Sequence, residues 1–361
     1  MTTKRISQDT LTSGEYSPKH WMELRREIMD NFSNTEKWRE AYDKFFLLRI
    51  ETRFIKPVKL IINSISPDES KSGEGFTITA ILCILIEYLQ AYYEGCNYTT
   101  GEPKLYEYKS SKAMFKNFFT MHEPFKTYFS PSDAEQFYDE VRCGLLHEAA
   151  TKGNSKIHAN KAGLLLEKSD EGFILDRDAL LAALEDYLDH YRKVLLFDDN
   201  LKKNFFRKID ALNGIEREFY FAYGSNLLKD RFEIERQIFV HTCHKAMLIG
   251  YKLVFNKKSK DTPNISYANL EDQPDEITWG VLYEIDKEDL VRLKRDYEDG
   301  YDRRPVKVNV GGRSVPAVTF MSNSICDELP RRSYVQKILT GAEEKGLPAD
   351  YIEKIRQCSN L

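Results

Sequence analysis

The sequence predicts a multidomain protein in which a mainly helical N-terminal domain precedes an α+β domain built on a small β-barrel with flanking helices. Three observations favour this fold class. The chain has 361 residues, and because domains usually contain about 100–200 residues, two domains are expected. Apolar residues recur at helical spacing up to about residue 200, whereas short runs of β-forming residues dominate after residue 216. Hydrophobic residues make up 42% and charged residues 30%, a balance typical of folded chains.

The N-terminal part is expected to be a flexible segment, residues 1–18, followed by a mainly helical domain over residues 19–200. A loop rich in Ser, Gly, Asp and Pro is predicted at residues 63–75. Residues 156–176 predict a short hairpin with a Ser-Asp-Glu-Gly turn. Apolar periodicity and capping residues predict helices over residues 21–62, 76–93, 114–125, 131–147 and 178–197.

The C-terminal part is predicted to begin after a charged connector, residues 201–215, which is expected to hold a short helix, and to span residues 216–361. Amphipathic helices are expected over residues 287–296 and from Ser333 onward. The runs of β-forming residues are EFYFAY, MLIGYKLVF, ISYANL, TWGVLYEI, VKVNV and VPAVTFM. This pattern indicates a small sheet that curls toward a barrel.

Composition favours a cytoplasmic protein. The formal net charge is −4 and the pI is about 6.1, so no whole-molecule basic field would attract nucleic acid or membrane. The six cysteines include no C-x-x-C pair, which argues against a zinc ribbon or a redox motif. The first 20 residues lack the apolar core of a signal peptide. The most apolar stretch, Phe76 to Ile86, is interrupted by Glu87, and we expect it to be too short to span a bilayer.

A Gly-Ser-Asn turn follows the aromatic strand FYFAY. Gly224 lets the backbone turn sharply and approach a ligand, while Ser225 and Asn226 add a hydroxyl and an amide. Backbone N–H groups in such a turn can converge on an anion or on a carbonyl oxygen. Taken alone, a tripeptide of this kind is more often an ordinary turn at the end of a strand.

Five segments, taken together and in order, resemble the γ-glutamylcyclotransferase family over residues 216–361. FYFAYGSNLLKDR is similar to the opening strand and substrate loop of the family, and ISYANL to its middle strand. TWGVLYEID is similar to the strand before the catalytic helix. DYEDGY places Glu298 where the family has its catalytic glutamate, and SYVQKILTGAEEKGLPADYIEKI is similar to the closing segment.

The resemblance implies an enzyme that cyclises a small γ-glutamyl substrate to 5-oxoproline and releases an amino acid or amine, without a metal or cofactor. Glu298 would act as general base and then general acid. The residues implied to bind the substrate are Tyr223, Gly224, Ser225, Asn226, Leu227, Tyr301 and Tyr334. Considered singly, each tyrosine is more often a packing residue than a ligand-binding one.

Two departures from the family pattern concern the leaving group. Phe320 stands where some relatives have a tyrosine, so one hydroxyl is missing. Arg303 and Arg304 place more positive charge here than the recognition of an aliphatic leaving amino acid would require. They could meet a second carboxylate on the substrate, or they could form a solvated rim.

The segment VRCGLLH in the N-terminal domain carries Arg142 and His147 at an R-x4-H spacing that resembles the motif of HEPN domains, which are helical and often dimeric. The resemblance implies RNA binding or cleavage, a homodimer through the helical domain, and a cyclotransferase-like domain that acts as sensor or regulator. On an ideal helix, residues five apart diverge. The alternative is that His147 ends the helix and Arg142 pairs with an acid such as Asp139.

A third possibility for the C-terminal domain is a non-catalytic module that only binds a small molecule, which the presence of Glu298 and of the whole YGSN turn disfavours. The cluster His241, Cys243 and His244 does not predict a metal site. In a strand its side chains are scattered over two faces, and three candidate ligands are fewer than a structural zinc site uses.

Overall fold

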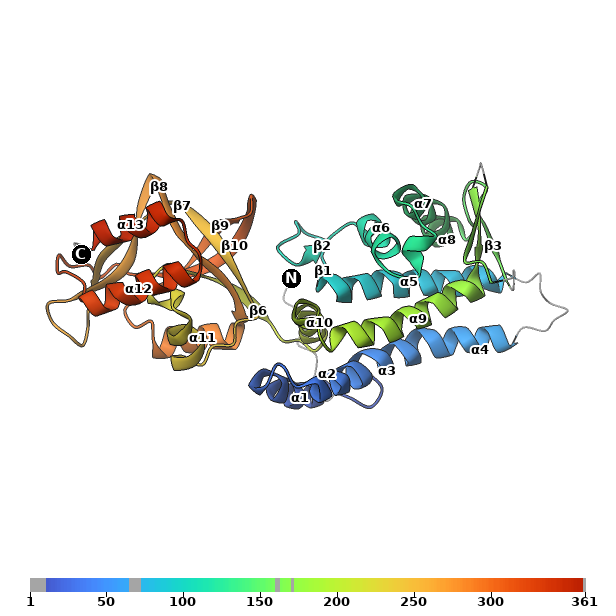
Figure 1. Cartoon of the computed structure of the whole chain (residues 1–361), viewed down its shortest axis with the longest axis horizontal. Helices are drawn as coiled ribbons and strands as arrows, with labels where there is room; N and C mark the ends of the chain where they lie inside the picture. The colour runs from blue at the N-terminus through green and yellow to red at the C-terminus, as the bar shows by residue number, and fades with distance from the viewer. Residues whose placement is uncertain (1–10, 65–72, 160–162, 170–171, 360–361) are drawn as a thin grey trace. The chain divides into compact units, whose positions relative to one another are not determined.

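The chain divides after Gly214 into two compact units in the computed structural model, which describes residues 11–64, 73–159, 163–169 and 172–359. The first unit is mainly helical, and the second contains a closed barrel (Figure 1).

The first unit begins with a helical run that is interrupted once. Helix α1 (Pro18–Asp30) is followed by a turn, and Asn34 then caps the next helix through its side chain, which accepts from the N–H groups of Glu36 and Lys37. The helix predicted over residues 21–62 is therefore broken near residues 31–34. The rest of the run is continuous: α2 (Thr35–Ala41), η1 (Tyr42–Leu47), α3 (Leu48–Ile50), η2 (Glu51–Ile55) and α4 (Lys56–Ser64).

The remaining helices of the unit pack around α5 and α9, which run alongside α4 in Figure 1. Their bounds are α5 (Glu74–Glu94), α6 (Ser111–Met121), η4 (Phe125–Thr127), α7 (Pro131–Gln136), η5 (Phe137–Arg142), α8 (Cys143–Glu148), α9 (Arg177–Leu195) and α10 (Asp199–Leu212). Elements α7, η5 and α8 follow one another without a break and cover the predicted helix 131–147. A reciprocal capping box between Ser130 and Asp133 starts this helix.

Two small sheets complete the first unit. Strands β1 (Asn97–Tyr98) and β2 (Glu107–Tyr108) pair in parallel. Strands β4 (Leu166–Ser169) and β5 (Gly172–Asp176) pair antiparallel, which confirms the predicted strand pair; the predicted turn lies partly outside the described residues. Strand β3 (Lys156–His158) adds to β5 in parallel.

The short helix expected in residues 201–215 is present as most of α10, but its predicted role as a connector is wrong, because α10 lies in the core of the first unit. The ring of Phe205 lies 5.5 Å from the rings of both Phe46 and Tyr92. Asp210 accepts a hydrogen bond from the Trp21 indole at 2.8 Å and pairs with Arg25 at 2.9 Å. Charged residues dominate the sequence of this segment, yet several of them are buried together with its apolar residues: Lys202, Arg207, Lys208 and Asp210.

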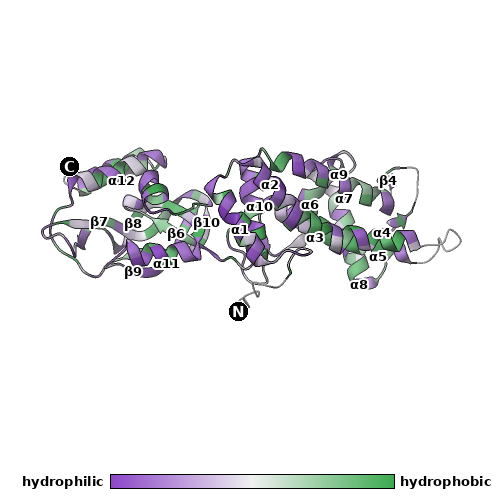
Figure 2. Ribbon diagram, turned by 90° about the horizontal axis from the view of Figure 1, so that it is seen from below, coloured by the Kyte–Doolittle hydropathy of each residue, from purple (hydrophilic) through white to green (hydrophobic). Residues whose placement is uncertain are grey.

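Helix α5 is longer than the sequence pattern indicated. By length and composition alone it could cross a membrane, and 56% of its most apolar window is buried inside the unit. Figure 2 shows hydrophobic residues along this helix. A mostly buried apolar helix is typical of the core of a folded domain.

The second unit is a closed barrel with the strand order β10-β6-β8-β7-β9. Its strands are β6 (Arg217–Ala222), β7 (Thr242–Lys258), β8 (Ser266–Asp286), β9 (Asp302–Val310) and β10 (Arg313–Met321). The β10–β6 pair is parallel and the other pairs are antiparallel. The segments ISYANL and TWGVLYEID, predicted as separate strands, are the two ends of β8, while MLIGYKLVF lies inside β7.

Helices flank this barrel. Helix α11 (Lys287–Asp296) follows β8 directly, and α12 (Arg332–Glu344) and α13 (Ala349–Cys358) close the chain. Short helical turns η6 (Ser225–Leu227) and η7 (Asp230–Glu235) lie between β6 and β7. Helix α12 packs directly on η6, and this contact supports the Gly-Ser-Asn turn from outside the barrel.

Candidate active site

A pocket of the second unit gathers residues from the end of β6, the start of β8, the segment after α11, strand β10 and helix α12. Its lining residues are Tyr220, Tyr223, Gly224, Ser225, Asn226, Ala268, Glu298, Tyr301, Phe320 and Tyr334. All but one of the residues expected to bind a γ-glutamyl substrate therefore lie around one pocket, together with the expected catalytic glutamate.

Glu298 is fixed by both its backbone and one of its carboxylate oxygens. It lies just after α11, and its N–H donates to the Leu293 carbonyl at 3.1 Å. Oxygen Oε1 accepts from Asn226 Nδ2 at 3.0 Å and from Arg236 Nη1 at 2.6 Å. Oxygen Oε2 has no partner within the described part of the chain. The carboxylate is thus held by one oxygen while the other can react.

Asn226 links the Gly-Ser-Asn turn to this carboxylate. A carboxylate only accepts hydrogen bonds, so the Asn226 atom that faces Glu298 is its amide nitrogen. The same nitrogen contacts the Tyr220 hydroxyl at 2.8 Å. Oxygen Oδ1 of Asn226 is buried and has no hydrogen-bond partner in the described structure. A buried acceptor without a donor is unfavourable, so this oxygen is suited to an N–H or O–H donor on a ligand.

Arg236 was missed by the sequence reasoning. Its side chain is buried, it forms the ion pair with Glu298, and its guanidinium lies 5.0 Å from the centre of the Tyr297 ring. Arg236 and Glu298 are 62 positions apart, and no spacing rule joins them. The neighbouring sequence, DRFEIER, is rich in charge, so no sequence signal distinguished this arginine from solvated neighbours.

The tyrosines of the pocket are neutral phenols, because burial raises the pKa of each above its ordinary value; for Tyr334 it reaches about 12. Tyr223 donates to the Phe320 carbonyl at 2.5 Å, and Tyr301 donates to the Ala268 carbonyl at 2.7 Å. The Ala268 N–H donates to the Tyr334 hydroxyl at 3.3 Å. Since Tyr223 and Tyr301 already donate their hydroxyl protons, they can only accept hydrogen bonds from a ligand.

Leu227 is the exception among the predicted binding residues. Its side chain is fully buried and does not line the pocket. It packs toward Gly341 of α12, where a Cβ on Gly341 would lie 2.8 Å from the Leu227 Cβ. The prediction of a binding role for the Leu227 side chain is therefore corrected to a packing role.

The residues that depart from the family pattern fall in two places. Phe320 lines the pocket, and its ring lies 5.3 Å from that of Tyr220. Arg303 and Arg304 do not line the pocket. Arg303 pairs with Glu218, and Arg304 lies 3.9 Å from Asp302. Of the two alternatives for these arginines, the structure favours a solvated rim.

Arg142 and His147 of the first unit are not in contact in the described structure. Arg142 ends η5, lies 3.8 Å from Glu87, and stacks near Tyr138. His147 is exposed near the end of α8. Asp139, the acid expected to pair with Arg142, instead pairs with Lys112 at 2.7 Å. The resemblance to HEPN domains stays a prediction.

The segment considered for metal binding holds its side chains in different environments. His241 is buried, and its Nε2 lies 2.7 Å from Asp286 Oδ1, whereas Cys243 is exposed.

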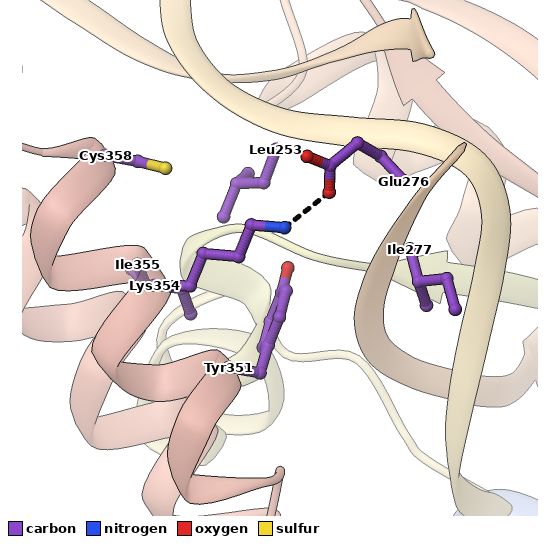
Figure 3. A pocket seen from close by; sticks show the side chains of 7 residues that line it. All are labelled: Leu253, Glu276, Ile277, Tyr351, Lys354, Ile355 and Cys358. Carbon is purple, nitrogen blue, oxygen red and sulfur yellow. Dashed lines mark hydrogen bonds and ion pairs between the residues drawn. The ribbon is translucent and has the colours of Figure 1, made fainter. Parts of the chain in front are cut away.

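A second hollow lies between α13 and the β7–β8 pair, where Lys354 pairs with Glu276 (Figure 3). It is lined by Leu253, Glu276, Ile277, Tyr351, Lys354, Ile355 and Cys358. Its one carboxylate is engaged by its one ammonium, and it contains none of the residues expected to act on substrate. The pocket around Glu298 is therefore the candidate active site.

Comparison with known proteins shows which family the second unit resembles. Residues 277–355 match the AIG2-like family. The chain is 31% identical over 150 residues to human γ-glutamylcyclotransferase, a match that covers 39% of this chain and 78% of the human protein. The bovine γ-glutamylcyclotransferase is 30% identical over 149 residues, with the same coverage.

A solved structure described as a γ-glutamyl cyclotransferase is 29% identical, covers 39% of this chain and 87% of its own, and has a TM-score of 0.35. A barrel with a glutamate-containing pocket and these sequence matches define an AIG2-like protein. Through its C-terminal part, this chain belongs to the γ-glutamylcyclotransferase family.

Proposed function

We propose that the C-terminal unit is a γ-glutamylcyclotransferase-like enzyme that converts a γ-glutamyl group to 5-oxoproline and releases an amino acid or amine. The observation that carries this proposal is the junction between Glu298 and the Gly-Ser-Asn turn. Two segments far apart in sequence meet in one pocket, where one oxygen of Glu298 is held and the other has no partner among the described residues.

The reaction needs two proton transfers between two nitrogens of one substrate. The α-nitrogen attacks the γ-carbonyl carbon, a C–N bond closes the five-membered ring, and the bond to the leaving nitrogen breaks. An α-ammonium begins with three hydrogens and the lactam nitrogen keeps one, so two protons move to the leaving amine. Oxygen Oε2 of Glu298 would carry them one at a time, as a general base and then a general acid.

The contacts of Asn226 explain how the α-nitrogen would reach this oxygen. The unpaired Oδ1 of Asn226 would accept one N–H of the α-ammonium. Because the amide of the same side chain contacts Glu298, the nitrogen bound in this way would lie beside the carboxylate. Bringing the nucleophile and its base together in a fixed geometry is a large part of the rate gain in reactions of this kind.

The Gly-Ser-Asn turn would stabilise negative charge. In the described structure, the backbone N–H groups of Ser225 and Asn226 have no backbone acceptor. They are suited to a substrate carboxylate or to the oxygen of the tetrahedral intermediate. Gly224 permits close approach: apart from its chain neighbours, the described atoms within 4 Å of where a Cβ would be are the Ala268 Cβ and the Tyr334 hydroxyl.

The test is the release of 5-oxoproline from a panel of γ-glutamyl amino acids, amines and peptides. We expect Glu298→Gln to lower kcat by about 10²–10⁴-fold, because the amide cannot carry a proton. Binding of 5-oxoproline should survive, since the amide oxygen can still accept from Asn226 and Arg236. The control is Glu288→Gln, the same change at an exposed position of α11. Unchanged turnover by Glu298→Gln would remove Glu298 from the mechanism.

A further inference from the structure

Two arginines of the first unit donate hydrogen bonds to a single backbone oxygen. Arg49 of α3 and Arg53 of η2 lie about one helical turn apart on the same run. Nη1 of Arg49 and Nη2 of Arg53 both donate to the Thr12 carbonyl, the second at 3.0 Å. The two guanidinium groups therefore lie next to each other, although their like charges repel.

No acidic side chain among the described residues forms an ion pair with either arginine. The titratable groups that face Arg53 are Arg49, Tyr88 and Tyr92, and burial together with the charge of Arg49 lowers the pKa of Arg53. A guanidinium carries five N–H donors, and the Thr12 carbonyl takes one from each arginine. Two adjacent cations without a counter-ion are unfavourable, so the position is suited to an anion that contacts both.

Lys208 of α10 adds a third cation to this part of the unit. Its side chain is buried, and its Nζ donates to the Cys96 carbonyl at 2.8 Å and to Asn97 Oδ1 at 3.1 Å. Burial lowers its pKa to about 8, and Arg49 is among the charged groups that face it. Glu87 also faces Lys208, but its carboxylate accepts hydrogen bonds from two hydroxyl groups instead. The positive potential around the two arginines is therefore reinforced by a buried ammonium.

Solvent reaches the arginine pair, and the surrounding elements hold it in place. Arg53 is exposed, whereas Arg49 and Tyr88 are half-buried. The Tyr88 ring lies 5.0 Å from that of Tyr92 and 6.1 Å from that of Phe54. Elements η2 and α10 both pack on α5, which carries the two tyrosines. Aromatic rings limit the water beside the guanidinium groups, and charge-assisted hydrogen bonds are stronger where water is limited.

We propose that Arg49 and Arg53 form a binding site for a phosphate group, free or as a monoester of a small molecule, and that Lys208 supports it by its charge. A phosphate monoester carries a charge of about −1.5 to −2 near pH 7 and presents three acceptor oxygens, which suits two adjacent guanidinium groups. The planar fork of donors on arginine matches phosphate oxygens bidentately. A phosphodiester or a carboxylate carries a single negative charge and balances only one of the two arginines. This site is independent of the proposed cyclotransferase reaction.

The test is a calorimetric titration of the whole chain with inorganic phosphate, with ribose 5-phosphate and with the phosphodiester ApA. We expect saturable binding of phosphate or of ribose 5-phosphate with a dissociation constant of about 1 mM or lower. Arg53→Met should weaken this binding by at least about 10-fold, because a hydrogen bond to a charged group is lost. Arg26→Met, at an exposed position of α1, is the matched control and should bind like the wild type.

The three compounds separate the sources of the phosphate group. Tighter binding of ribose 5-phosphate than of inorganic phosphate would identify a phosphorylated small molecule as the ligand, and equal binding would assign the site to phosphate itself. Tighter binding of ApA than of both monoanionic competitors' replacements, phosphate and ribose 5-phosphate, would overturn the assignment to a phosphate monoester.

Thermal unfolding distinguishes binding from a purely structural role of the arginines in holding Thr12. A ligand that binds only the folded state stabilises it, so phosphate should raise the Tm of the wild type above its value in sodium chloride of equal ionic strength. Arg53→Met should lose this increase. The proposal is overturned if Arg53→Met lowers the Tm by the same amount in both salts, or if the wild type shows no saturable binding of either phosphate compound.

Discussion

At the scale of single residues, the candidate site depends on the different roles of the two oxygens of the Glu298 carboxylate. Glu298 uses one oxygen to meet a neutral amide and a guanidinium. The amide comes from the turn that would hold the substrate, and the guanidinium comes from the end of η7. The contacts that fix the carboxylate are therefore separate from the oxygen that would move protons.

Arg236→Met tests the guanidinium contact. The change leaves Glu298 buried without its cationic partner, and removing one member of a buried ion pair costs about 3–5 kcal/mol of folding free energy. We expect a fall of this size in the urea unfolding of the second unit, followed by Trp279 fluorescence, together with a loss of turnover. Arg295→Met, which removes an exposed pair with Asp296, should leave the stability of the unit nearly unchanged. Arg236 would be a minor contributor if the two variants unfolded alike.

Some residues of the candidate site could be predicted from the sequence and others could not. Glu298 and the Gly224–Asn226 turn were predicted because they sit inside contiguous segments that resemble a family. Arg236 was not, because it reaches the site through a contact between segments that are distant in the chain. Leu227 shows the opposite failure, since it lies inside the matching segment but its side chain packs away from the pocket.

At the scale of elements, the Gly-Ser-Asn turn depends on the close approach of α12. A Cβ on Gly341 would lie 2.4 Å from the Leu228 nitrogen and 2.6 Å from the Leu227 carbonyl carbon. Both are backbone atoms, so they could not move aside without moving η6. The Gly-Ala pair in the closing segment is thus explained by packing.

Gly341→Ala is expected to displace η6 and reduce turnover by at least about 10-fold, although alanine favours a helix by about 1 kcal/mol over glycine. An overpacked contact of this kind costs about 1–3 kcal/mol, which exceeds the gain in helix propensity. The measurements are 5-oxoproline release and thermal unfolding. The same change in α5, Gly75→Ala, should be neutral or stabilising, because the Cβ would meet atoms no closer than 3.5 Å. Full activity in Gly341→Ala would show that η6 tolerates displacement.

The elements also show where periodicity succeeds and where it fails. The predicted helices of the first unit and the β-rich second unit were found, since apolar spacing follows burial. The length of β8 was not, because its solvent-facing middle, EDQPDEI, has the composition of a loop. A helix was predicted in the segment of α10, but its place in the core was missed, because its charged residues outnumber the apolar residues that it buries.

At the scale of the whole molecule, the two units carry different kinds of information. The family matches concern the C-terminal 39% of the chain.

The helical unit has its own aromatic core, and the histidine buried in it, His122, has a lowered pKa. His122 lies 4.4 Å from the Tyr93 ring and 5.0 Å from that of Tyr187, and its Nε2 contacts Gln90 at 2.9 Å. Burial, with a smaller effect from His190, lowers its pKa to about 4.

This histidine predicts that the helical unit loses stability in mild acid. An unfolded chain binds a proton at His122 near pH 6.5, whereas the folded unit does so only near pH 4. Between these values the unfolded state holds more protons, so the free energy of unfolding falls as pH falls. The difference between the two pKa values corresponds to about 3 kcal/mol in the free energy of unfolding.

Urea unfolding followed by the fluorescence of Trp21 and Trp38 should show part of this loss of stability between pH 7 and pH 5. His122→Gln should reduce it, and His158→Gln, at an exposed position of β3, should not. Identical pH dependence in all three proteins would mean that other groups, and not His122, set the acid sensitivity of this unit.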